Sequence, residues 1–78
     1  MERRANGAAI STIRKALGMR QGALAAKAGI TSAYLSQIEH GDRFPPLDTI
    51  TRLANELGVT VDSISYPHPV AAPEQATA

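Results

Sequence analysis

The sequence predicts an all-α fold of four to five short helices, and three observations support this prediction. Apolar residues recur at helical spacing, glycines stand where the periodic segments end, and no segment shows the alternation of a strand. The chain has 78 residues and no cysteine. A single core must therefore form without disulfides, and packed helices are the simplest way to build one.

The first helix is expected to begin after Asn6, whose side chain can cap it. Its apolar positions follow at helical spacing: Ile10, Ile13 and Leu17. Gly18 ends the pattern. Residues 1–6 precede the helix and are predicted to form a basic N-terminal arm.

Two short helices are expected next, at about residues 21–28 and 32–40. Gly29 closes the first, Thr31 is a suitable N-cap for the second, and Gly41 ends it. Two helices joined by so short a connection form an angled pair, in which one helix can cross a phosphate backbone while the next enters a groove.

The fourth helix has the clearest apolar pattern and ends at Gly58. The pattern consists of Leu47, Ile50, Leu53, Ala54 and Leu57. Thr60 can cap one final turn. Residues 67–78 contain three prolines and little apolar surface to bury, so they are predicted to be a disordered tail. The folded domain should therefore span residues 7–66.

The charges are unevenly distributed along the chain. All eight basic residues lie in the first 52 positions with four acids, whereas the remaining positions hold three acids and no base. This polarity suits an anionic partner, although a solvated mixed surface explains the charges equally well. No segment has the apolar run of a secretion signal or a membrane span, so a cytoplasmic location is expected.

One face of the third helix is small, polar and uncharged, where a solvated face would carry Glu and Lys. It consists of Ser32, Ala33, Ser36 and Gln37. A helix in the DNA major groove needs small residues for close approach, and hydroxyls or amides that meet the base edges. The composition of this face therefore favours base reading.

Two segments, RQGALAAKAGITSAYLSQIEHG and PPLDTITRLANELGV, resemble the lambda-repressor and Cro family of helix-turn-helix proteins, also called XRE-type. The resemblance covers about residues 7–66, with the helix-turn-helix at about 21–40. It implies a compact lambda-repressor-like domain that binds operator DNA as a homodimer and controls transcription.

The resemblance assigns roles to individual positions. Base reading is assigned to Ser32, Ala33 and Gln37, with Ser36 beside them. A glutamine can bind adenine with two hydrogen bonds, whereas Ala33 could also be silent. The resemblance implies phosphate contacts from Gln21, Thr31 and Tyr34, and the positive charges of Arg20, Lys27 and Arg43 suit the same role. Gln21 could instead be an exposed residue at a helix start, and Tyr34 could be a half-buried packing residue.

The resemblance also implies a structural ion pair between Arg14 and Glu39, although Arg14 could alternatively contact phosphate. The chain departs from the family pattern at four positions before its final turn. Arg20 replaces the usual Ser or Thr cap, Asp42 replaces a common basic residue, Phe44 replaces a polar one, and Pro46 replaces a common capping serine before the fourth helix. The sequence does not decide whether Phe44 covers the fourth helix or faces a partner subunit.

The expected dimer surface lies near the end of the domain and comprises Val59, Val61, Ile64 and Tyr66. Relatives often place a large aromatic residue where this chain has Ser63, so a monomer that pairs only on DNA would fit the sequence.

The leading hypothesis is a Cro-like repressor of transcription. Two alternatives are a restriction-modification controller protein and an antitoxin whose main partner is a toxin. Enzyme activity is not expected, because the chain has two histidines, no cysteine and no recognisable catalytic pair. No metal, cofactor or small-molecule ligand is expected.

Overall fold

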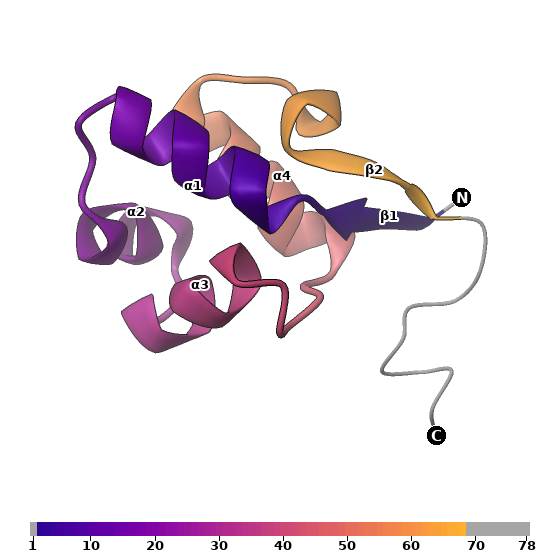
Figure 1. Ribbon diagram of the computed structural model, residues 1–78, viewed down its shortest axis with the longest axis horizontal. Coiled ribbons are helices and arrows are strands. Elements are labelled where there is room, and N and C mark those ends of the chain that lie inside the picture. Colours follow the sequence, from indigo (N-terminus) through magenta and orange to yellow (C-terminus); the bar gives the residue numbers. More distant parts are fainter. Residues whose placement is uncertain (1, 69–78) are drawn as a thin grey trace.

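The structure is a computed structural model, and it describes residues 2–68. The elements follow in the order β1 (Glu2–Ala5), α1 (Gly7–Ala16), α2 (Gln21–Ala28), α3 (Ser32–Glu39), α4 (Leu47–Leu57), η1 (Val61–Ile64) and β2 (Ser65–His68). The predicted four helices and final turn are confirmed, and η1 is a 3-10 turn. In Figure 1, α3 lies at the lower margin of the molecule, away from η1.

Local capping chemistry explains where the helices begin. Asn6 Oδ1 accepts a hydrogen bond from the backbone N–H of Ala9 at 3.1 Å, and Thr31 Oγ1 accepts one from Tyr34 at 3.0 Å. Such caps satisfy backbone donors that a helix start leaves without a partner. Arg20 makes no such bond at the start of α2, because an arginine side chain has no acceptor.

The turn between α2 and α3 requires a glycine. Gly29 has φ of 76°, in the left-handed region that L side chains rarely adopt. The backbone N–H of Ile30 then donates to the carbonyl of Ala25 at 2.9 Å, which closes the end of α2. The chain can therefore turn sharply into α3.

The core lies between all four helices and η1, and the predicted apolar positions form most of it. The largest fully buried side chains are Ile10, Leu24, Leu35, Ile38, Ile50, Leu53 and Ile64. Leu17 and Leu47 belong to the apolar patterns of their helices but are 56% and 50% exposed. Leu17 is the C-cap of α1, and Leu47 is the first residue of α4.

Two short strands were not expected from the sequence. β1 pairs with β2 antiparallel, with Arg3 opposite Pro67 and Arg4 opposite Tyr66. The N–H of Asn6 donates to the Ile64 carbonyl at 2.8 Å, which continues this register. Because hydrogen-bonded pairs alternate along an antiparallel ladder, Pro67 occupies a position whose missing N–H faces away from β1.

The prediction of a basic N-terminal arm is wrong for Arg3. The side chain of this residue contacts the C-terminal part of the domain. Arg3 Nε donates to Ser65 Oγ at 2.8 Å, and Arg3 Nη2 lies 2.9 Å from Asp62 Oδ1. Residues 2–5 of the predicted arm form β1, because these contacts and the pairing with β2 hold them in place. Pro67 and His68, which were predicted to belong to the disordered tail, form part of β2 because they pair with β1. The rest of the predicted tail, from position 69 onward, lies outside the described residues.

Candidate nucleic-acid interface

The helix α3 has an inner face and an outer face. Leu35 and Ile38 on the inner face are fully buried. The outer face carries the four residues that the sequence analysis singled out: Ser32, Ala33, Ser36 and Gln37. Ser36 is half-buried and the other three are exposed. The structure therefore leaves the small polar face of α3 on the surface, where a ligand can reach it.

A buried ion pair joins α1 to the inner side of α3. Arg14 Nε donates to Glu39 Oε2 at 2.8 Å and Arg14 Nη2 donates to Oε1 at 3.1 Å. The two side chains are only 10% and 5% exposed. Arg14 Nη1 also donates to the Met19 carbonyl at 2.9 Å. Arg14 is therefore turned inward, away from any outer ligand.

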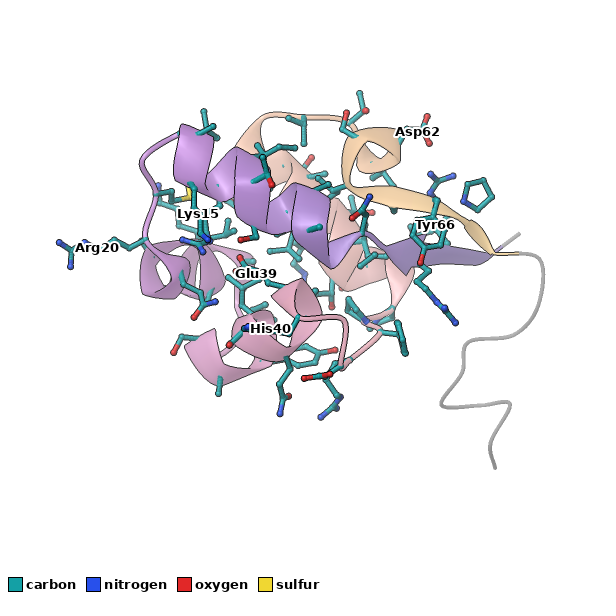
Figure 2. The ribbon with its side chains drawn as sticks, in the orientation of Figure 1. Lys15, Arg20, Glu39, His40, Asp62 and Tyr66 are labelled. Atoms are coloured by element: carbon teal, nitrogen blue, oxygen red, sulfur yellow. The ribbon has the colours of Figure 1, made fainter. Side chains whose placement is uncertain are left out.

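Gln21, at the start of α2, takes part in the same cluster. Its Nε2 donates to Glu39 Oε1 at 3.1 Å. Figure 2 shows Glu39 lying between α1, α2 and α3. The NH2 group of Gln21 is thus bound to Glu39, and this bond fixes the first turn of α2 beside the end of α3.

Glycine at position 7 allows α1 and α3 to approach closely. A Cβ atom on Gly7 would lie 2.3 Å from the carbonyl oxygen of Ile38 and 2.6 Å from that of Glu39. Both atoms are backbone atoms of α3 and cannot move away cheaply. Together with the ion pair, Gly7 fixes the end of α3 against the start of α1.

The eight basic side chains divide into two groups. One group has partners away from the outer face of α3: Arg3, Arg4, Arg14 and Arg52. The other group is exposed: Lys15, Arg20, Lys27 and Arg43. Within the described chain Lys15, Arg20 and Lys27 have no hydrogen-bond or ion-pair partner, and Arg20 projects away from the body in Figure 2. These cations can bind an external anion without breaking an internal contact.

Arg43 folds back onto the outer face of α3. Its Nη1 donates to Gln37 Oε1 at 3.5 Å, and its Cζ lies 5.3 Å from the centre of the Tyr34 ring. Tyr34 is half-buried and packs partly against the core. Thr31 Oγ1 serves as the cap of α3.

Phe44 is half-buried, and the guanidinium of Arg4 lies above its ring at 4.3 Å from the centre. This contact joins β1 to the loop that follows α3. Arg4 Nε is buried, and within the described chain it has no hydrogen-bond partner. The Arg4 side chain is therefore half-buried and lies against Phe44.

Sequence reasoning missed the role of Arg52. Its Nη1 donates to the Ala28 carbonyl at 3.3 Å, and its Nη2 contacts Asp48 Oδ2 at 2.5 Å. Arg52 thus connects α4 to the end of α2, beside the turn that leads into α3. The spacing of four residues from Asp48 is the only signal in the sequence, and it does not identify the carbonyl.

The four residues assigned to a dimer surface differ in exposure. Ile64 is fully buried in the core of its own chain, because η1 folds against α4 and α1. It therefore offers no surface to a partner. Val59 and Val61 are partly buried, and Tyr66 is 43% exposed.

Two negative findings concern the described residues alone. Within residues 2–68, no group of three or more His, Cys, Asp or Glu side chains could hold a metal ion. No helix in this part of the chain is both long and apolar enough to cross a membrane.

Comparison with protein families matches residues 10–64 to the family described as helix-turn-helix. The chain belongs to this helix-turn-helix family. The match covers α2, α3 and the turn between them, together with most of the core. A comparison with curated proteins finds no match.

Solved structures of DNA-binding regulators resemble the chain. The restriction-modification controller protein C.AhdI from Aeromonas hydrophila is 30% identical, with a TM-score of 0.71 over 73% of this chain and 86% of that one. SinR, described as a master regulator for biofilm formation and solved in complex with DNA, is 33% identical, with a TM-score of 0.68 over 73% of this chain and 95% of that one.

The P22 c2 repressor, solved in complex with a synthetic operator, is 29% identical, with a TM-score of 0.70 over 74% of this chain and 88% of that one. Family membership and these structures together support a DNA-binding transcriptional regulator.

Proposed function

We propose that the protein is a Cro-like repressor, which binds a two-fold operator with α3 in the major groove of each half-site. The observation that carries this proposal is the outer face of α3. It is exposed, small, polar and free of acidic groups, while the only carboxylate of the helix, that of Glu39, is buried in an ion pair. Such a face can approach base edges without repelling phosphates.

The proposal assigns affinity to groups around α3. Arg20 and Lys27 are exposed cations on or beside α2, and they can attract phosphates. The first turn of α2 lacks a side-chain cap, so its backbone N–H groups can bind a phosphate beside Gln21. Thr31, Tyr34 and Arg43 are assigned to the backbone on the other side of the groove. These contacts position the protein without reading sequence.

The proposal also requires two copies of the chain, because one recognition helix contacts only a few base pairs. Half-sites about 34 Å apart would place both α3 helices on the same side of the duplex. Val59, Val61 and Tyr66 remain the proposed dimer surface, without Ile64. The modest apolar area of three residues fits a dimer that forms on DNA.

One experiment tests the proposal directly: selection of bound duplexes from a random pool by the full chain. We expect an enriched motif with two-fold symmetry. Ala33→Glu should abolish enrichment, because it places a carboxylate in the groove. The matched variant Asn55→Glu adds the same charge on α4, at another exposed position, and should retain it. Absence of an enriched motif, or equal behaviour of the two variants, contradicts the proposal.

A second candidate, a restriction-modification controller, is favoured by the similarity to C.AhdI over 86% of that protein. It predicts the same DNA contacts and differs in the genes controlled. Selected motifs located upstream of restriction or methyltransferase genes would support it.

A further inference from the structure

Three side chains form a cluster on the outer side of α3, defined here as the Gln37–Arg43–Tyr34 cluster. Gln37 and Tyr34 are three residues apart on the helix, so they are neighbours on its surface. Arg43 comes from the loop after α3 and contacts both: Nη1 donates to Gln37 Oε1, and the guanidinium lies over the Tyr34 ring. The guanidinium of Arg43 therefore lies beside the outer face of α3.

The contact with Arg43 changes the balance of donors and acceptors at Gln37. A glutamine amide has one acceptor oxygen and one NH2 group with two donors. In this cluster the oxygen accepts one bond from Arg43 at 3.5 Å, which leaves its second lone pair and the whole NH2 group for an outside partner. The guanidinium has further N–H donors and no acceptor. The Gln37–Arg43 pair therefore offers several donors beside one remaining acceptor site.

Base edges in the major groove differ in what they can accept. Adenine presents an acceptor at N7 and a donor at N6, whereas guanine presents two acceptors, N7 and O6. The two-bond contact between glutamine and adenine needs the amide oxygen, for which the Arg43 guanidinium competes. A surface richer in donors than in acceptors matches guanine better than adenine.

We propose that Gln37 and Arg43 together read a guanine in each half-site, and that Arg43 determines specificity. This inference rests on the proposed function, because it requires α3 in the major groove. It replaces the adenine contact that an isolated glutamine would favour, and it makes Arg43 more than a phosphate contact. The cation–π contact between Arg43 and Tyr34, with Cζ 5.3 Å from the ring centre, supports this role, because it favours a guanidinium position beside Gln37 before DNA binds.

The test is to repeat the selection with Arg43→Met and with Lys27→Met. The parent chain should prefer guanine over adenine at one position of each half-site by roughly 5- to 150-fold, the range of a good two-bond base contact. Arg43→Met releases the amide oxygen of Gln37, so the preference at this position should change from guanine to adenine. Other positions of the motif should remain as they are.

Lys27→Met is the matched control, because it also removes one exposed cation but leaves the cluster intact. It should weaken binding to all sequences alike and preserve the guanine. Circular dichroism of both variants checks that they remain folded. A parent motif with adenine at this position overturns the inference, as does an Arg43→Met motif that keeps its guanine.

The failure of this inference differs from the failure of the proposed function. If Arg43→Met weakens every sequence equally and the motif persists, the protein still reads DNA and Arg43 contacts only phosphate. If the parent chain enriches no motif, the proposed function itself fails, and the inference fails with it.

Discussion

The two faces of α3 each hold an arginine against a side-chain oxygen of the helix, but the two contacts differ in burial and geometry. On the inner side Arg14 binds Glu39 with two short bonds, and both side chains are buried. On the outer side Arg43 meets Gln37 at 3.5 Å, and both residues are exposed. Burial thus separates a contact that fixes the helix from one that an external ligand can use.

This difference has a physical basis in solvation. A buried charge without its partner is costly, because no water replaces the lost contact. An exposed contact is worth little, because water competes for the same groups. The inner face should therefore control the free energy of unfolding, and the outer face should control binding. Three predictions test this division, beginning with the largest expected effect.

Removal of one partner of the inner ion pair should have the largest effect. Arg14→Met leaves Glu39 buried without its guanidinium, so the free energy of unfolding should fall by about 3–5 kcal/mol. Urea denaturation measures this change. The double variant Arg14→Met with Glu39→Leu should recover much of the loss, because it leaves no charge unpaired. If the single variant lost less than about 1 kcal/mol in the free energy of unfolding, the Arg14–Glu39 pair would not be what holds α3 against α1.

Gly7→Ala should have the next largest effect, because its Cβ would overlap backbone oxygens at the end of α3. We expect a loss of up to about 3 kcal/mol in the free energy of unfolding, the upper end for ordinary overpacking. Gly22→Ala is the matched control in α2, since a Cβ there meets nothing within 4 Å. The free energy of unfolding of this control should rise by about 0.5–1 kcal/mol, because alanine is the better helix residue. Thermal denaturation compares the stabilities of the two variants. A change of the same sign in both would contradict the close approach of α1 and α3 at Gly7.

Gln37→Ala should separate the two faces most sharply. Its free energy of unfolding should change by less than about 0.5 kcal/mol, because the side chain is exposed. Discrimination at one base position should fall by roughly 1–3 kcal/mol. Parallel denaturation and competition binding measure both quantities. Lower affinity with an unchanged motif would mean that Gln37 does not read a base.

The sequence predicts the helices of this fold well, because their determinants are local. Asn6 and Thr31 cap the next turn of the chain, and Gly29 ends α2 through its own backbone angles. The ion pair between Arg14 and Glu39 was predicted from the family resemblance, since no periodicity in the sequence connects the two residues.

The remaining features depend on residues that meet only after folding. Arg3 and Ser65 are 62 positions apart, and strands of four residues are too short to show alternation. The contact of Arg52 with Ala28 and that of Arg43 with Gln37 likewise require the tertiary arrangement. Burial of Ile64 was missed because an apolar residue in a final turn suits a core and an interface equally.

The central claim is that the outer face of α3 touches base edges, and thiol cross-linking tests it most directly. The chain has no cysteine, so one introduced thiol is unique. We would combine Ala33→Cys with the selected duplex carrying a thiol tethered to a base in the major groove, and use Asn55→Cys on α4 as the control. A disulfide-linked complex with Ala33→Cys alone is the predicted result. A complex with Asn55→Cys, and none with Ala33→Cys, would contradict the claim.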